Sequence, residues 1–166
     1  MTPTTRKELA LMVPNGGTVI ELGVAAGLFA EDLLTTNPQI RYIGVDRWSD
    51  HHDAKEMGSA IARISAVSDN FETVRATFRD YLPSVQYESI DMIYVDGYAH
   101  TGQEGGETLN DWWPRVKPGG IFAGHDYCQE YHQTQKVVDS FVATHGLELH
   151  IIDEKPHPSW WVRKPA

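Results

Sequence analysis

The chain has 166 residues, of which 41% are hydrophobic, a length that suits one well-buried core and excludes two ordinary domains. Its 23 acidic residues outnumber 14 basic ones, and the formal net charge of −9 disfavours a surface that neutralises nucleic-acid phosphates or anionic lipids. Without a signal peptide or an apolar run of the about 20 residues that span a bilayer, we expect one cytoplasmic domain over residues 1–166 that binds a small molecule, not nucleic acid or membrane.

The N-terminal stretch predicts a short amphipathic helix, which Thr4 or Thr5 caps and which ends near Met12. Pro14–Gly17 then turns the chain into the run Thr18–Leu22. The β-branched, nearly uncharged residues of this run are typical of a strand that is buried on both faces.

The loop after this strand has the composition of a ligand-binding turn. Apolar residues at i,i+4 spacing from Leu28 to Leu34 predict a helix, which Asn37-Pro38 ends. The loop pattern E-x-G-x-x-x-G is formed by Glu21, Gly23, Ala25 and Gly27. Small side chains there let backbone N–H groups at the helix start approach a ligand. Because Ala25 stands where G-x-G-x-x-G has its second glycine, a nicotinamide or flavin site is disfavoured.

The next two strand candidates are also followed by polar residues. Arg41–Val45 predicts a second buried strand, which delivers Asp46 to the edge where a parallel sheet can hold the two hydroxyls of a ribose. Phe71–Ala76 predicts a third strand. The residues Thr77–Tyr81 follow it, at the position where parallel sheets that hold a nucleoside usually contact its adenine.

Between these strands, Trp48–Val67 begins as a polar loop and continues as a helix. The sequence His51-His52-Asp53 in this loop suggests a metal site. Adjacent histidines in a polar loop are more often solvated, and we expect that outcome here.

The second half of the chain begins with another strong strand pattern. Ile90–Val95 predicts a buried strand that ends at Asp96. A helix is expected over Thr108–Val116, a turn over Lys117–Gly120 and a fifth short strand over Ile121–Ala123.

The C-terminal part predicts a helix over Val137–His145, which Gly146 ends, and a last pair of strands. These strands are expected over Leu147–Asp153 and Ser159–Arg163. The single cysteine, Cys128, has no internal disulfide partner and no C-x-x-C spacing, so we expect it to be a packing residue.

Taken in order, these motifs resemble the class I S-adenosylmethionine (SAM) dependent methyltransferases of the Methyltransf_24 family. Besides the glycine loop and an Asp-Trp pair in the predicted helix, the matching motifs are Asp96-Gly97-x-x-His100, Lys117-Pro-Gly-Gly120 and Gly124-His125-Asp126-Tyr127. The likeness covers roughly Thr18 to Tyr127. It implies a Rossmann-like, doubly wound α/β sheet of about seven strands in the order 3-2-1-4-5-7-6, with an antiparallel last strand and helices on both faces.

The resemblance also implies SAM as the cofactor, with the glycine loop around its amino-acid end and the acid of the second strand on its ribose. The residues expected to bind SAM are Glu21, Gly23, Ala25, Gly27, Asp46, Arg47, Thr77, Phe78 and Asp96.

In the implied strand order, the fourth and fifth strands are neighbours about 4.8 Å apart, so Asp96 and Asp126 can converge on one cation. Carboxylate oxygens favour Mg²⁺ or a similar ion, and His125 is the natural third ligand. Relatives often carry two carboxylates at the position of His125-Asp126. The histidine therefore shifts the expected preference toward Mn²⁺, Fe²⁺ or Zn²⁺, or it means that no metal binds.

The relatives of this kind are metal-dependent O-methyltransferases that act on sugars and other hydroxylated metabolites. We therefore expect methylation of a hydroxyl on a small molecule, with Asp96 and a cation holding that hydroxyl and with His100 or His125 accepting its proton. The alternative is a non-catalytic SAM-binding or metabolite-binding module, because the chain lacks a long extension over the acceptor. In a transferase this short, we expect the acceptor pocket to come from Trp48–Ser59, the loop Tyr98–Glu107 and a neighbouring subunit, so a homo-oligomer is possible.

Overall fold

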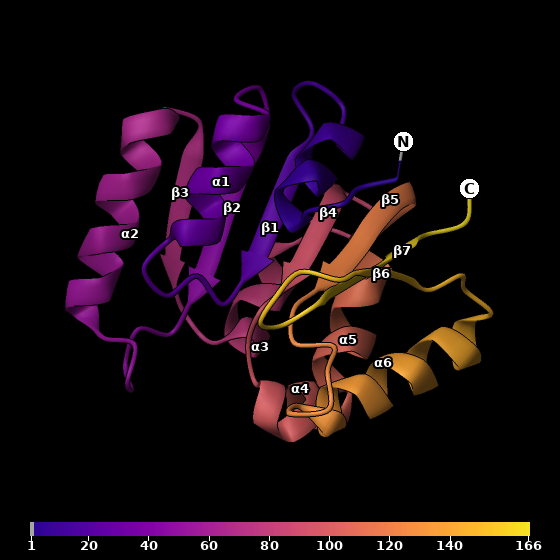
Figure 1. Ribbon diagram of the computed structural model, residues 1–166. Helices are drawn as coiled ribbons and strands as arrows, with labels where there is room; N and C mark the ends of the chain where they lie inside the picture. Colours follow the sequence, from indigo (N-terminus) through magenta and orange to yellow (C-terminus); the bar gives the residue numbers. More distant parts are fainter. Residues whose placement is uncertain (1) are drawn as a thin grey trace.

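The computed structural model describes residues 2–166, which form a seven-stranded sheet with helices on both faces (Figure 1). The strand order is β3-β2-β1-β4-β5-β7-β6, with β1 to β5 parallel and β7 antiparallel to both β5 and β6. The strands are β1 Thr18–Leu22, β2 Arg41–Asp46, β3 Phe71–Arg75, β4 Ile90–Val95, β5 Val116–Gly124, β6 His150–Ile152 and β7 Ser159–Arg163. The predicted fold class and strand order are confirmed.

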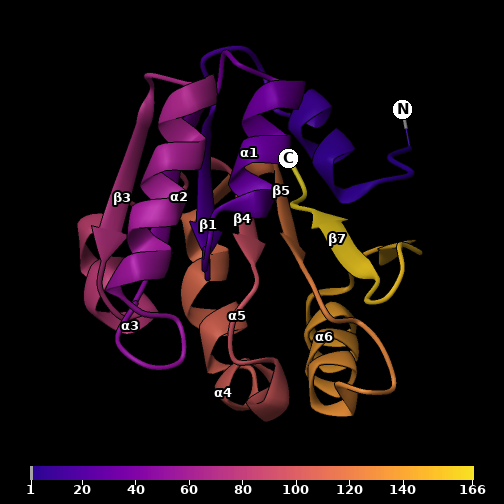
Figure 2. The same cartoon turned by 60° about the vertical axis from the view of Figure 1, so that its left-hand side comes forward.

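The helices divide between the two faces of the sheet (Figures 1 and 2). One face carries η1 Arg6–Met12, α1 Leu28–Thr36 and α2 Ala54–Val67. The opposite face carries α3 Phe78–Tyr81, α5 Glu107–Trp112 and α6 His132–His145, and α4 Gly102–Gly105 contacts α5 and α6. Three single turns of 3-10 helix complete the chain: η2 Leu82–Ser84, η3 Ala99–Thr101 and η4 Trp113–Arg115.

Alternate residues of each central strand enter two separate hydrophobic cores. In β4, Met92 and Tyr94 pack with the core under η1 and α1, whereas Ile93 and Val95 pack with the core under α5 and α6. Both sets are fully or almost fully buried. This two-sided burial explains why the central strands lack the polar alternation of a half-exposed strand.

The predicted turn at Lys117–Gly120 is wrong, because these residues lie inside β5. The pairing passes from Ile90 opposite Val116 to Met92 opposite Ile121, so four residues of β5 bulge beside one residue of β4. Backbone bonds to Lys164 also hold the bulge as part of the sheet: Gly119 N–H donates to Lys164 O at 2.9 Å, and Lys164 N–H donates to Gly120 O at 2.9 Å. A Pro-Gly-Gly stretch thus marks a bulge here rather than a turn.

Three other element boundaries differ from the prediction. Helix α6 begins at His132 and not at Val137, because its first turn is mostly exposed and polar and therefore shows no apolar period. The helix expected over Thr108–Val116 begins at Glu107 and tightens to the 3-10 turn η4 at Pro114, since proline has no N–H to continue the α-helical pattern. The strand expected over Leu147–Asp153 is reduced to β6, which pairs only with β7.

The carboxyl ends of β1, β2, β4 and β5 meet at the lower edge of the sheet in Figure 1. The loops that leave these ends carry most of the residues singled out from the sequence. Within residues 2–166, no helix is both long enough and apolar enough to cross a membrane.

Candidate functional site

A cavity of about 730 Å³ lies at this edge of the sheet. Its lining includes Gly23 after β1, Asp46 at the end of β2, Asp96 after β4, and His125 and Asp126 after β5. Backbone pairing continues past the strand ends, with Asp96 N–H donating to Leu22 O at 2.7 Å and His125 N–H donating to Val95 O at 3.0 Å. The sheet therefore sets the positions of these side chains directly.

The loop between β1 and α1 requires glycine at two positions. Gly23 has φ +95°, and a Cβ there would lie 2.1 Å from the carbonyl oxygen of Asp96. Gly27 has φ +78°, and a Cβ there would lie 2.9 Å from the Cα of Ala60 in α2. Both glycines let the loop pass closely over neighbouring backbone, which keeps the start of α1 beside the cavity.

The carboxylate of Asp46 holds this loop in place. One oxygen accepts hydrogen bonds from the N–H groups of Val24 and Ala25, both at 2.9 Å, and the other accepts from the N–H of Trp48 at 3.0 Å. The buried Trp48 ring returns a bond from Nε1 to the carbonyl of Ala25 at 2.9 Å. These contacts stabilise Ala25 at φ +49°, a left-handed conformation that is unfavourable for alanine.

Glu21 lies at the base of the cavity and is almost completely buried. Burial raises the pKa of Glu21 to about 8, although the hydroxyl of Tyr42 donates a 2.5 Å hydrogen bond to the carboxylate and opposes the shift. The side chain is therefore mostly protonated at neutral pH.

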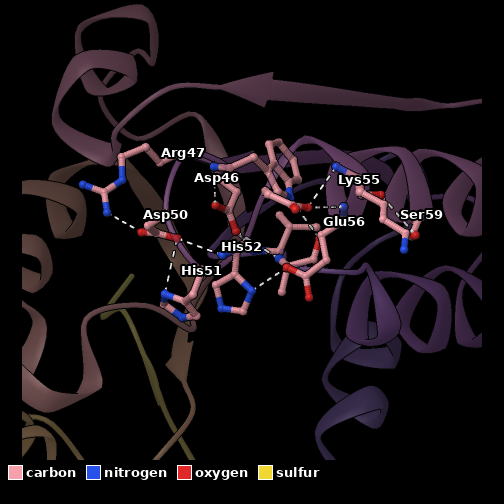
Figure 3. A network of polar contacts seen from close by, with 12 residues as sticks. Asp46, Arg47, Asp50, His51, His52, Lys55, Glu56 and Ser59 are labelled. Carbon is pink, nitrogen blue, oxygen red and sulfur yellow. Dashed lines mark hydrogen bonds and ion pairs between the residues drawn. The ribbon is translucent and has the colours of Figure 1, made fainter.

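The polar loop after β2 is internally paired (Figure 3). Arg47 forms an ion pair with Asp50, and Nδ1 of His52 lies 2.5 Å from Oε2 of Glu56. Asp53 caps α2, accepting from the N–H groups of Lys55 at 2.9 Å and Glu56 at 3.0 Å. The three residues His51-His52-Asp53 thus do not form a common ligand set, although both histidines line the cavity.

The predicted SAM-binding residues are largely gathered at the cavity. All but Gly27 and Thr77 line it. The Thr77 hydroxyl accepts a bond from the N–H of Asp80 at 3.1 Å and so caps α3 instead. Phe78 lies in the lining with its ring 5.1 Å from that of Tyr98, which provides an aromatic wall at the β3 side.

Asp96, His125 and Asp126 form the one group in the described part of the chain with the spacing of a metal site. One ligand atom from each lies within 4.8 Å of the others. Nδ1 of His125 lies 3.5 Å from Asp96 Oδ1 and 3.2 Å from Asp126 Oδ1. The predicted convergence of the two aspartates therefore occurs in the structure.

The negative charge of this group is partly offset by a proton on His125. Burial favours the neutral imidazole, but hydrogen bonds to Asp126 and Asp96 outweigh it and raise the pKa of His125 to about 9. The proton on Nδ1 lies between two carboxylates, where a divalent cation would bind. Once this proton is lost, Nδ1 and the two carboxylates are a donor set that fits a metal.

A row of aromatic rings extends from this group along the cavity. The rings of His125 and His157 are 6.0 Å apart, those of His157 and Tyr131 are 5.2 Å apart, and those of Tyr131 and His100 are 5.0 Å apart. His157 also places Nδ1 3.5 Å from Asp126 Oδ1 and Nε2 3.1 Å from Glu130 Oε2. Of the four residues whose rings form this row, only His100 and His125 were predicted from the sequence as site residues.

Other lining residues carry no sequence signal for a site, among them Arg6, Phe29, Tyr131 and His157. Tyr98 begins the loop Tyr98–Glu107, which was expected to contribute to the acceptor pocket. Arg6 and His157 lie near opposite ends of the chain, and the fold alone brings them to the cavity. A helix period in residues 6–12 predicts η1 but says nothing of what its first residue contacts.

The family model of the Methyltransf_24 methyltransferase domain matches residues 20–127, which is more than half of the chain. The matched region includes the glycine loop, Asp46, Asp96 and the His125-Asp126 pair. No curated protein matches the chain.

Solved structures share the fold at low sequence identity. An O-methyltransferase from Bacillus cereus in complex with SAH matches with TM-score 0.74 and 16% identity, over 99% of this chain and 82% of that one. A SAM-dependent O-methyltransferase from Thermotoga maritima matches with TM-score 0.70 and 14% identity, over 100% of this chain and 68% of that one. An rRNA methylase from Streptococcus thermophilus matches with TM-score 0.69 and 15% identity, over 95% of this chain and 92% of that one. The fold is thus that of class I SAM-dependent methyltransferases, and it does not by itself identify the acceptor.

Proposed function

Because the chain belongs to the Methyltransf_24 family of methyltransferase domains, we propose that it methylates a hydroxyl group of a small molecule, with SAM as the methyl donor and a divalent cation at Asp96, His125 and Asp126. The observation that carries this proposal is that the group with the spacing of a cation site lines the same cavity as the glycine loop.

The cavity fits SAM in size and construction. Its volume of about 730 Å³ lies within the range of roughly 300–1,000 Å³ for small-molecule sites. The loop at Gly23 would admit no Cβ, and the N-terminus of α1 adjoins it. Asp46 orders the loop, and its Oδ1 accepts only one of the three bonds, which leaves this oxygen able to accept another hydrogen bond from a ribose hydroxyl.

The chain's own residues position the acceptor. Asp96 and Asp126 bring two carboxylates together in the lining of the cavity, and a cation bound there would lower the pKa of an acceptor hydroxyl. The cofactor, when bound, supplies an electrophilic methyl group on a sulfonium. The aromatic row of Tyr131, His157 and His100 forms the adjoining wall.

Proton removal is assigned to His100. Nδ1 of His125 is held between both carboxylates, so this nitrogen is not free to accept a proton from the acceptor. The ring of His100 stands on the cavity wall against Tyr131, and the residue is exposed enough to pass the proton to solvent.

The test is methyl transfer from labelled SAM to a panel of sugars and catechols, with Mg²⁺ or Mn²⁺ and with chelator. We expect Asp96→Ala and Asp126→Ala to lower turnover at least a hundredfold, as loss of a residue that holds the reacting group does. Asp111→Ala is the matched control, because Asp111 is exposed on α5 and does not line the cavity. Turnover that both site variants retain would contradict the role of the cation, whereas SAM binding without transfer to any acceptor would favour the non-catalytic module.

A further inference from the structure

The first residue of η1 reaches the cavity from outside the sheet. Arg6 lines the cavity although η1 belongs to the core on the α1 face. Its backbone N–H donates to Oε2 of Glu154 at 2.7 Å, and its guanidinium carbon lies 4.9 Å from the centre of the Phe29 ring. Leu9 and Ala10 of the same helix are completely buried. The position of the arginine is therefore fixed by packing.

Arg6 is the one arginine or lysine of the cavity lining without a carboxylate within hydrogen-bond distance. Among the lining residues, only Arg6 and Arg47 are lysine or arginine, and Arg47 is paired with Asp50. The nearest carboxylate oxygen to Arg6, Oδ2 of Asp96, is 3.8 Å away, which is too long for a hydrogen bond. The neighbouring Glu21, mostly protonated at neutral pH, does not neutralise it fully. The hydroxyl of Tyr94 also lies beside the guanidinium. Because a guanidinium has several N–H donors, donors remain available for an anion.

The order of the strands places Arg6 at a defined end of the site. Asp46 at the end of β2 marks the ribose side, and the glycine loop after β1 lies next. Arg6 lies beyond the loop, beside Phe29 of α1 and Asp96, which follows β4. A ligand with its ribose at Asp46 that crosses the loop directs its other end toward Arg6. In SAM that end carries an amino group and a carboxylate.

We propose that Arg6 binds the carboxylate of the amino-acid portion of SAM, a role that rests on the proposed function. Guanidinium and carboxylate match in shape and form paired hydrogen bonds, which a lysine cannot reproduce in full. The N-terminal helix thereby becomes part of the cofactor site, although it precedes the region that the family model matches.

The test is calorimetric titration of SAM and of decarboxylated SAM, which differ by the carboxylate alone. Arg6→Met keeps the aliphatic stem against Phe29 and removes the charge. Since a hydrogen bond to a charged group is worth a tenfold or larger change in affinity, we expect a roughly tenfold to hundredfold loss for SAM. Affinity for decarboxylated SAM should change less than about twofold, and Arg6→Lys should be intermediate for SAM. Arg63→Met, which breaks an exposed pair with Glu31 away from the cavity, is the control.

Equal losses for both ligands, together with a lower melting temperature, would overturn the proposal in favour of a structural role for Arg6. Unchanged SAM affinity in Arg6→Met would also overturn it. A raised KM for carboxylated acceptors in that variant would then assign the arginine to the acceptor. If the wild-type protein bound neither ligand, the proposed function would fail and this inference with it.

Discussion

The two halves of the cavity are built in different ways. The half around the glycine loop comes from neighbouring strand ends, and its polar groups are satisfied within the protein, as the three N–H bonds to Asp46 show. The half around Asp96 and Asp126 draws on segments from across the chain, including His157, and it brings two carboxylates together with only a protonated imidazole between them. The first half is ordered before any ligand binds, whereas the second holds excess negative charge for a cation.

The largest expected effect is a loss of stability from a substitution in the glycine loop. Gly23→Ala combines a positive φ with a Cβ that would lie 2.1 Å from backbone, so we expect a loss of about 4 kcal/mol in the free energy of unfolding. Urea unfolding measures this loss. Gly16→Ala has a similar φ of +77° but open space around it, so it should cost only about 1 kcal/mol. Equal losses in the two variants would show that the close approach at Gly23 contributes nothing.

The next effect concerns the buried acid beneath the loop. The pKa of Glu21 is raised to about 8 from an ordinary 4.5, so between these values the native state binds more protons than the unfolded state. The contribution to stability is complete below about pH 4.5 and is lost as the pH rises toward 8. Relative to Glu21→Gln, the wild type should lose on the order of 3 kcal/mol between pH 5 and pH 8. Parallel pH profiles for the two proteins would show that Glu21 is ionised when folded.

The smallest expected effect is the thermal stabilisation by a cation in the half of the cavity around Asp96 and Asp126. A cation that replaces the proton on His125 binds only the folded state, so at a hundredfold excess over Kd it should stabilise the protein by about 2.7 kcal/mol. For a chain of this size, that corresponds to a rise of roughly 5–10 °C in the melting temperature. Thermal unfolding with Mn²⁺, Zn²⁺ and Mg²⁺ should show the rise in the wild type and not in Asp126→Ala. An identical rise in both proteins would place the ion elsewhere.

The difference between the halves also explains what could be predicted from the sequence. The central strands were found because burial on both faces produces continuous apolar runs, and the acids at their ends followed from parallel topology. The convergence of Asp96, His125 and Asp126 could therefore be predicted from the sequence. The contact of Arg6 with the cavity could not be predicted, because it depends on how η1 packs across α1.

Local signals also failed where the same residues suit two structures. Lys117–Gly120 has the composition of a turn, but two bonds to Lys164 keep it in the sheet as a bulge. His157 lies in a proline-rich connection that carries no period, so only the pairing of β6 with β7 brings it beside Asp126. The contact of His157 with the site therefore could not be predicted from the sequence.

The most direct test of the account is calorimetric titration of S-adenosylhomocysteine into the wild type, Asp46→Ala and Asp126→Ala. We expect one site per chain in the wild type and loss of binding in Asp46→Ala, because the glycine loop loses its hydrogen bonds. Binding should be retained in Asp126→Ala, because Asp126 belongs to the other half of the cavity. Absence of binding to the folded wild-type protein would contradict the assignment of the cavity to SAM.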